Sequence, residues 1–237
     1  MASILDRITN KVRTQERITR DEALTLFESD DVLRLGRIAD EVKQRRWSNR
    51  AHFVINRQIN PSNICVLSCR FCDYATKRGK PNAYEMTIEE ILSKCNAELR
   101  EVHIVGGLHP DWTWEFYLEM FRAITAGFPQ IQIKAWTAVE IDFFAKKFRK
   151  SVEQVLEELR AVGLVALPGG GAEVFSERVR KALYPFKIGA PRWLEIHKIA
   201  HRMGIDATFK QGYPEPVAMD TAIMEHVNQR WHQYWTA

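Results

Sequence analysis

Three cysteines within eight residues constrain this chain more than any other feature of its sequence. They are spaced C-x3-C-x2-C at Cys65, Cys69 and Cys72, directly after an apolar, β-branched run. Thiolates are the standard ligands of iron–sulfur clusters, and three thiolates on one loop can bind three irons of a cubane [4Fe-4S] cluster. The fourth iron then has no protein ligand, so the spacing favours a cluster that binds a small molecule over simple electron storage.

Phe71 completes the motif because it places an aromatic residue directly before the last cysteine. A C-x3-C-x-aromatic-C run after a predicted strand resembles the radical SAM superfamily. In that superfamily the amino and carboxylate groups of S-adenosylmethionine chelate the open iron. The resemblance therefore implies two cofactors, a [4Fe-4S] cluster and S-adenosylmethionine.

Two other uses of cysteine fit the chain less well. A zinc site usually combines two ligand pairs, and no second Cys or His pair lies at a suitable spacing. A disulfide framework needs a secreted, cysteine-rich chain, whereas this one has four cysteines in 237 residues and starts without a basic-then-apolar signal region. We therefore expect a cytoplasmic protein. Cys95 lies in a polar helical context and is predicted to be a packing residue rather than a fourth ligand.

The composition predicts a soluble enzyme with neither a membrane nor a nucleic-acid partner. Hydrophobic residues make up 46% of the chain, but no apolar run is long enough to span a bilayer. The formal net charge of +4 is too small to indicate an obligate nucleic-acid partner. The basic runs at residues 77–80 and 146–150 are interpreted as solvated faces, with steering of an anionic substrate as the alternative.

Helical and strand patterns alternate along the chain. A capping box at Thr19–Glu22 and helical spacing over residues 31–46 predict an N-terminal helical cap over residues 1–50. Strands are predicted at residues 53–55, 59–66, 101–105, 131–135, 164–167 and 205–209. Helices are predicted at residues 87–99, 114–126, 138–148, 151–162, 177–183 and 192–203. This alternation requires parallel pairing with right-handed crossovers, so we expect an α/β fold, a partial (βα) TIM-like barrel, over residues 51–210.

Unusual loops follow four of the predicted strands, and ligands of parallel sheets bind at the carboxyl ends of strands. Glycines allow the backbone to approach a ligand closely and to offer N–H groups. The alternative for the glycines is ordinary turn formation. Glu140 and Glu173 can bind ribose hydroxyls or the ammonium group of S-adenosylmethionine, or they can merely serve a helix dipole. The residues predicted to bind the cofactor are Phe71, Gly106, Gly107, Thr137, Glu140, Gly170 and Glu173.

Four segments together resemble the aminofutalosine synthase family of radical SAM enzymes. They are residues 56–72, His103–Pro110, Lys134–Ile141 and Leu167–Phe175. Dehypoxanthine futalosine cyclase and FO synthase share the cysteines and the glycine loops, and they remain the alternatives. Thr137–Glu140 and Ala172–Phe175 look more like the synthase than the cyclase.

The resemblance implies a reaction of the futalosine route to menaquinone. An electron donor such as flavodoxin or ferredoxin reduces the cluster, which passes one electron to S-adenosylmethionine and releases methionine and a 5′-deoxyadenosyl radical. The radical adds to the vinyl ether of 3-[(1-carboxyvinyl)oxy]benzoate, and rearrangement with loss of one carboxyl group gives 6-amino-6-deoxyfutalosine. The two carboxylates of this substrate need cations, for which position favours Arg57, Lys134 and His109. His109 and Glu140 are the candidate catalytic residues.

The chain departs from the family pattern in three ways. Gln58 stands where the family has His, and Phe186 stands where it has Gly. Residues 211–237 match nothing in the family and are predicted to be a divergent or out-of-frame tail. Counted from Ile59, the pattern gives five strands up to Phe209, whereas the partial barrel of radical SAM enzymes has six. We therefore expect a barrel that is incomplete at the C-terminus, with poor cluster assembly and little or no aminofutalosine; an inactive iron–sulfur protein is the alternative.

Overall fold

Five short parallel strands form the scaffold that positions the site. The computed structural model describes residues 3–207 and divides them into two units, residues 3–53 and residues 54–207. The strands all belong to the second unit: β1 (Asn56–Ile59), β2 (Glu101–Ile104), β3 (Gln132–Ala135), β4 (Leu164–Leu167) and β5 (Asp206–Ala207). They lie in the order β1-β2-β3-β4-β5, and every neighbouring pair is parallel.

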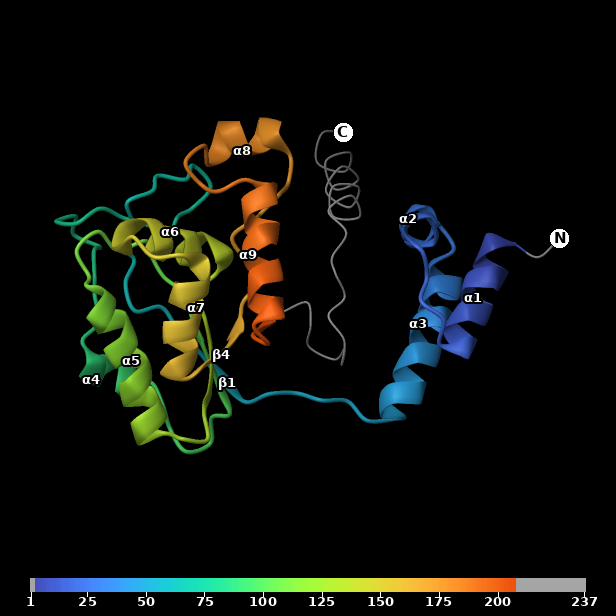
Figure 1. Cartoon of the computed structure of the whole chain (residues 1–237), viewed down its shortest axis with the longest axis horizontal. Helices are drawn as coiled ribbons and strands as arrows, with labels where there is room; N and C mark the ends of the chain where they lie inside the picture. Colours follow the sequence, from blue (N-terminus) through green and yellow to red (C-terminus); the bar gives the residue numbers. More distant parts are fainter. Residues whose placement is uncertain (1–2, 208–237) are drawn as a thin grey trace. The chain divides into compact units, whose positions relative to one another are not determined.

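Helices connect these strands and cover one face of the sheet. They are α4 (Ile88–Leu92), α5 (Trp114–Gly127), α6 (Ala138–Phe148), α7 (Val152–Ala161), α8 (Glu177–Leu183) and α9 (Ala190–Arg202). Parallel crossovers are right-handed in nearly all proteins, so strands that follow one another in order place their connecting helices on the same face. In Figure 1, α5, α7 and α9 run side by side, in agreement with their mutual contacts.

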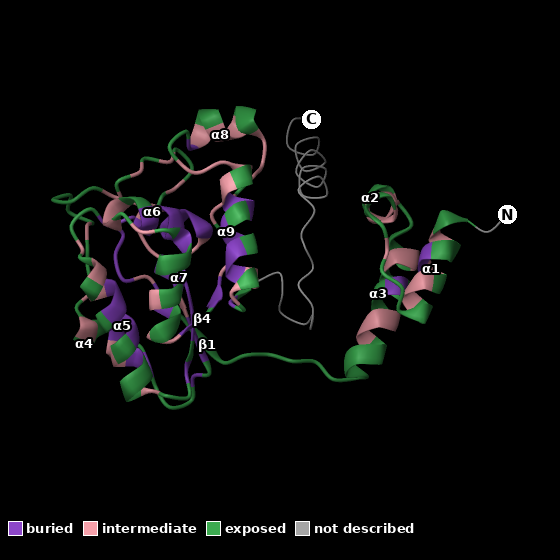
Figure 2. Cartoon of the chain, in the orientation of Figure 1, coloured by how far each residue is buried: buried purple, intermediate pink, exposed green. Residues whose placement is uncertain are grey.

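The face beneath the helices is apolar and carries the core. Val102 of β2 is in register with Ile133 of β3, and Ile104 with Ala135, and all four side chains are fully buried. The helices turn buried faces, purple in Figure 2, towards the sheet. Phe121 of α5 is one of their fully buried side chains. This burial of aliphatic and aromatic area is the main source of stability for such a layered fold.

The N-terminal unit consists of three helices, α1 (Ile4–Thr14), α2 (Arg20–Glu28) and α3 (Val32–Trp47). The capping box predicted at Thr19–Glu22 is present at the start of α2. The sequence pattern did not single out α1, although Ser3 and Asp6 form a capping box of the same kind and were its available signal.

Two predicted elements are wrong in extent. The strand predicted at residues 59–66 ends at Ile59, because Pro61 offers no N–H and the side chains of Ser62 and Asn63 bond to the carbonyls of Tyr84 and Asn82 instead of extending a ladder. The strand predicted at residues 53–55 is replaced by β1, which begins at Asn56.

The helix predicted at residues 87–99 is also too long. It is confirmed only as α4, because the side chain of Asn96 accepts the N–H groups of Glu98 and Leu99 and forms a turn that competes with the helix. The predicted tail, residues 211–237, lies outside the described residues. Among the described residues, no helix has the length and apolar character needed to cross a membrane.

Candidate functional site

The cysteine loop, residues 65–76, follows β1 in the chain, and its first and last residues lie next to each other. The N–H of Cys65 donates to the carbonyl of Thr76 at 3.0 Å, which closes the loop. The N–H of Val66 donates at 3.0 Å to the carbonyl of Leu108, in the segment that follows β2. The loop is therefore fixed at the carboxyl edge of the sheet, where the sequence placed the chemistry.

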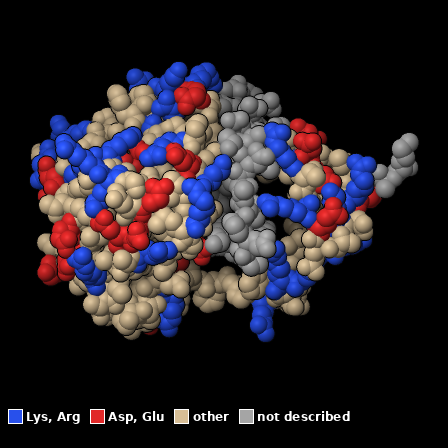
Figure 3. Space-filling view, viewed as in Figure 1, with Lys and Arg blue, Asp and Glu red and all other residues tan. Residues whose placement is uncertain are grey.

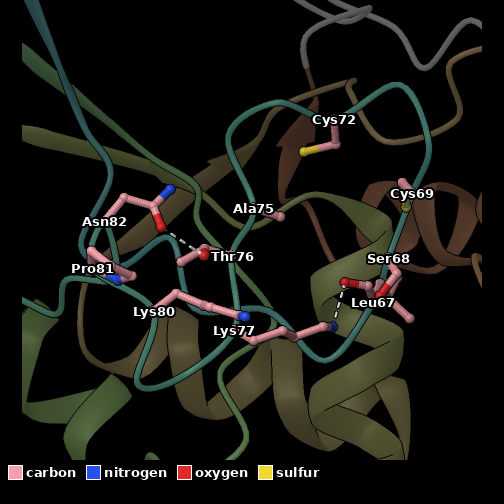
Figure 4. A pocket seen from close by; sticks show the side chains of 10 residues that line it. All are labelled: Leu67, Ser68, Cys69, Cys72, Ala75, Thr76, Lys77, Lys80, Pro81 and Asn82. Atoms are coloured by element: carbon pink, nitrogen blue, oxygen red, sulfur yellow. Dashed lines mark hydrogen bonds between the residues drawn. The ribbon is translucent and has the colours of Figure 1, made fainter.

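Cys65, Cys69 and Cys72 are free thiols at partly exposed positions. Cys69 and Cys72 line a cavity of about 400 Å³, whose lining side chains are drawn in Figure 4. Burial raises the pKa of Cys69, the positive charge of Lys187 lowers it, and the thiols of Cys65 and Cys72 raise it further. The three sulfur atoms are therefore close enough to act on one another electrostatically.

This donor set fits a [4Fe-4S] cluster better than a single metal ion. Within residues 3–207, no group of three or more His, Cys, Asp or Glu side chains is arranged to hold one ion. Each thiolate of a cubane binds a different iron, so the thiolates lie farther apart than the ligands of one ion do. Three free thiols on one loop, two of which line a cavity, meet the needs of such a cluster. The assignment of the three cysteines as ligands stays a prediction.

Cys95 lies apart from these three, in the core beside α4. Its thiol donates to the carbonyl of Ile91 at 3.9 Å, and the residue is 9% exposed. This position agrees with the packing role predicted for it.

The glycine pair after β2 packs directly on the backbone that leads into the cysteine loop. A Cβ atom on Gly107 would lie 2.2 Å from the carbonyl oxygen of Ile64, which no side chain can tolerate. The N–H of Gly107 also donates to the carbonyl of Ser62 at 2.8 Å. A Cβ on Gly106 would lie 3.0 Å from the same Ser62 oxygen. Gly107 is thus required by packing, while the predicted contacts of Gly106 and Gly107 with S-adenosylmethionine stay predictions.

Trp136 turns the chain from β3 into α6 and thereby directs Glu140 towards the glycine pair. It adopts a left-handed conformation with φ 60°, which is strained for a bulky side chain. Its indole is 2% exposed and stacks at 6.2 Å on Phe121, so packing supports the strain. The sequence pattern did not single out Trp136, because positive φ at a tryptophan has no sequence signal.

Glu140, in the first turn of α6, joins the ends of β2 and β3. Its Oε1 accepts the N–H of Gly106 at 2.9 Å, and its Oε2 accepts the N–H of Thr137 at 2.6 Å. Burial nevertheless raises the pKa of Glu140 to about 7, against the two backbone N–H groups and Lys187, which lower it. The side chain therefore gains or loses a proton near neutral pH, as a group that handles protons or cations must.

The ammonium group of Lys187 contacts both Glu173 and Phe71. Lys187 Nζ lies 2.7 Å from Glu173 Oε1 and 5.2 Å from the centre of the Phe71 ring. Phe71 also packs edge-on against Tyr184, with ring centres 5.4 Å apart. The structure thus brings Phe71 and Glu173 together beside the cysteine loop, with Lys187 as a member that the sequence pattern did not single out.

The glycines after β4 differ from each other. Gly171 has φ +91°, and a Cβ there would lie 2.9 Å from Val139 Cγ2, so a side chain is excluded. Gly170 has only Thr137 Cγ2 near its Cβ position, at 3.7 Å, so packing does not require glycine there. A ligand contact remains the prediction for Gly170.

His109 is fully buried, and both of its ring nitrogens are engaged. Nδ1 accepts the N–H groups of Asp111 and Trp112 at 3.2 and 3.1 Å, so the proton is on Nε2, which lies 2.9 Å from Glu85 Oε2. Burial lowers the pKa of His109, although Glu85 opposes this effect. The structure therefore places His109 as a link between the segment after β2 and the segment after the cysteine loop. Its predicted catalytic and substrate-binding roles stay predictions.

Arg57 and Lys134 lie on opposite faces of the sheet. Arg57 is in register with the buried Val102 on the helix-covered face, and its charge lowers the pKa of Cys95, which burial raises. Lys134 is in register with His103 on the face that the connecting helices leave open. Its Nζ lies 3.8 Å from Glu101 Oε1, and Glu101 also pairs with His103. Of Arg57 and Lys134, only Lys134 lies on the open face.

Comparisons with known proteins agree with this geometry. The chain matches the radical SAM superfamily model over residues 59–214. It is 38% identical over 208 residues to aminodeoxyfutalosine synthase of Streptomyces coelicolor, covering 86% of this chain and 54% of that protein. It is 36% identical over 214 residues to aminodeoxyfutalosine synthase of Thermus thermophilus, covering 88% and 58%. It is also 38% identical over 212 residues to cyclic dehypoxanthine futalosine synthase of Streptomyces coelicolor, covering 86% and 53%.

The chain thus spans about half the length of the curated relatives it matches. Among solved structures, HydG, a maturase of the [FeFe]-hydrogenase, has a TM-score of 0.65 at 18% identity and covers 99% of this chain and 52% of that chain. This likeness concerns the fold alone. The family resemblance that the motifs indicated is confirmed. The predicted α/β fold is confirmed as well.

We expect Cys65→Ala, Cys69→Ala and Cys72→Ala each to prevent stable cluster assembly, because each change removes one of three iron ligands. Cys95→Ala is the matched control and should keep its cluster. Iron and sulfide analysis after anaerobic reconstitution measures the effect. A loss of iron in the Cys95 variant as large as in the other three would show that the ligand set is wrong.

The raised pKa of Glu140 predicts a pH-dependent stability. A carboxyl whose pKa is 4.5 when unfolded and about 7 when folded contributes its full stability below pH 4.5 and loses it as the pH rises through about 7. The difference corresponds to about 3 kcal/mol. Relative to Glu140→Gln, the wild-type free energy of unfolding should therefore fall between about pH 5 and pH 8.

Urea denaturation at a series of pH values measures this difference. Glu157→Gln, at an exposed position of α7, is the control for pH effects elsewhere in the chain. A wild-type minus Glu140→Gln difference that is constant over the whole range would mean that Glu140 stays ionised in the folded protein.

Proposed function

The chain belongs to the radical SAM superfamily, and on that premise we propose that it performs the reaction of the aminodeoxyfutalosine synthases. Membership implies a [4Fe-4S] cluster and S-adenosylmethionine as cofactors. The substrate is 3-[(1-carboxyvinyl)oxy]benzoate, and the product is 6-amino-6-deoxyfutalosine. The observation that carries the proposal is the position of the cysteine loop, directly against the glycine pair and the buried Glu140 at one edge of the sheet.

The bound cluster supplies one electron that breaks the C5′–S bond of S-adenosylmethionine and releases methionine. The adenosyl C5′ forms a new bond to the methylene carbon of the enolpyruvyl group. The benzoate ring would then move from the enol oxygen to the neighbouring carbon, and the enolpyruvyl carboxylate would leave as carbon dioxide and one electron. The reaction therefore consumes no net reductant, although a donor such as flavodoxin or ferredoxin must deliver the first electron.

The protein's own residues bind and orient the substrate, and they exclude water from the site. The two carboxylates of the substrate need cations, and the open face of the sheet offers Lys134, which is 4% exposed. Glu101, at 3.8 Å, balances its charge without a close hydrogen bond. The ammonium can therefore donate to a ligand carboxylate, a charge-assisted bond that contributes about 1.5–3 kcal/mol. Water and other hydrogen donors must stay away from the radical carbon.

The face drawn in Figure 3 supports a small-molecule substrate. Lys and Arg side chains are interspersed there with Asp and Glu side chains rather than gathered in a basic stripe. A nucleic-acid partner would favour such a stripe. A small anionic substrate needs only a local cation inside the site.

A second candidate is the reaction of cyclic dehypoxanthine futalosine synthase. It is favoured by one observation, the 38% identity that the chain shares with both Streptomyces coelicolor enzymes. The two functions differ in the substrate, so product analysis separates them.

The proposal predicts that reduced, reconstituted protein converts S-adenosylmethionine and the enolpyruvyl benzoate to methionine and an adenosyl adduct. Mass spectrometry of the products measures this, and Cys69→Ala should form neither product. A second form, extended with the part of the Streptomyces coelicolor synthase beyond the match, separates low activity from a wrong substrate. Cleavage of S-adenosylmethionine without any adduct, in both forms, would contradict the assignment.

Lys134→Met should weaken binding of the enolpyruvyl benzoate about 10-fold or more, because the charge-assisted bond to a carboxylate is lost. Calorimetric titration of the reconstituted protein measures the dissociation constant. Arg57→Met tests the other predicted cation, and Lys94→Met, at an exposed position, is the control. If Arg57→Met weakens binding and Lys134→Met does not, the assignment of the substrate to the open face is wrong.

A further inference from the structure

Lys77 makes contacts that its place in a basic run does not indicate. Its ammonium group donates three hydrogen bonds, to the carbonyl oxygens of Cys65, Val66 and Leu67, at 2.8, 2.9 and 2.8 Å. An ammonium group has three donors, so all of them are used on three successive residues. Figure 4 shows Lys77 reaching across the cavity towards this backbone. Lys77 is exposed, as the interpretation of residues 77–80 as a solvated face requires, but that interpretation gave no sign of these three bonds.

Three successive carbonyls that converge on one point need a cation. In an extended strand, successive carbonyls point in opposite directions, so their dipoles do not face one another. Here the backbone curves so that three partial negative charges meet, an arrangement that repels itself without a positive charge at its centre. The curve begins at the first predicted iron ligand, and the N–H of Leu67 turns back to Cys65 Sγ at 3.4 Å.

We propose that Lys77 is a positioning residue for the iron–sulfur cluster, because its ammonium holds the backbone of Cys65–Leu67 in the curve that lets the three thiols bind one cluster. The proposal rests on cluster binding and not on the identity of the substrate. Lys77 directly follows Thr76, whose carbonyl accepts the N–H of Cys65. Lys77, the residue directly after the cysteine loop, thus fixes the backbone geometry where the loop begins.

The same contact places a positive charge beside the cluster. A cation stabilises the reduced, more negative state, so it raises the reduction potential of the cluster. Lys77 therefore has two separable effects, one on the shape of the loop and one on the charge around the cluster.

Lys80 provides a matched control. It lines the same cavity, and its ammonium makes no hydrogen bond to the cysteine loop in the part of the chain that the structure describes. Its removal changes the net charge by the same amount as removal of Lys77. Arg78 is unsuitable as a control, because it pairs with Glu85 and Asp111.

The experiment compares anaerobically reconstituted wild-type protein with Lys77→Met, Lys77→Arg and Lys80→Met. Iron loss to a chelator and the midpoint potential from an EPR-monitored titration are measured, and circular dichroism checks that each variant is folded. Lys77→Met should lose iron about 10-fold faster, the lower end of the usual effect of such supporting contacts. Its midpoint potential should move to more negative values, whereas Lys80→Met should resemble the wild type in both measurements.

Lys77→Arg separates the two effects. It keeps the positive charge, so its potential should stay near that of the wild type, but a planar guanidinium cannot direct three donors from one nitrogen, so its iron loss should be intermediate. Wild-type iron retention and potential in folded Lys77→Met, or equal losses in Lys77→Met and Lys80→Met, would overturn this proposal alone. Absence of a cluster from the wild-type protein would overturn the cofactor assignment as well.

Discussion

The close approach of two backbone segments is the constraint on which the rest of the site depends. The segment that leads into the cysteine loop crosses the turn after β2 so closely that Gly107 has no room for a Cβ, which would lie 2.2 Å from the oxygen of Ile64. The same glycine donates its N–H to Ser62. A displacement at this crossing therefore moves the three thiols and the Gly106–Glu140 bond together. The site is one unit because its parts share this contact.

The buried charges around this crossing are only partly compensated. Glu140 receives two backbone N–H groups but, within residues 3–207, no cation in contact, and burial is the largest effect on its pKa. The positive charge of Lys187 lowers that pKa from a distance, while its ammonium pairs directly with Glu173. A cationic ligand at this edge would supply the missing compensation and shift Glu140 towards its ionised form.

The sequence predicted regular elements well and the geometry between them poorly. The bounds of α6, β4 and α8 are those of the predicted segments, because strong periodicity and clear caps define them. The strand predicted at residues 59–66 is wrong beyond Ile59, since the side chains of Ser62 and Asn63 there bond to loop carbonyls instead of extending the sheet. Local pattern cannot distinguish these two uses of an apolar run.

The same limit applies to the residues of the site. The cysteines were found by spacing alone, because their chemistry depends on residue type and separation. Lys77 was interpreted as solvated, since its three acceptors are backbone carbonyls of a loop that any sequence could supply. His109 lies in the segment after β2 as the sequence indicated, and its Nδ1 is engaged by close neighbours, but the contact of its Nε2 is with Glu85, more than 20 residues away. Contacts of this kind become visible only in three dimensions.

The two faces of the sheet carry different kinds of side chain. The strand register decides which residues lie on the same face. Side chains alternate along a strand, so neighbours in sequence such as Ile133 and Lys134 point to opposite faces. Ile133 meets Val102 beneath the helices, whereas Lys134 meets His103 on the open face. A shift of one residue in the pairing would bury the lysine among aliphatic side chains and expose the isoleucine. The apolar residues of β2 and β3 therefore do more than stabilise the core: by fixing the register, they also hold Lys134 beside His103 on the face that the connecting helices leave open.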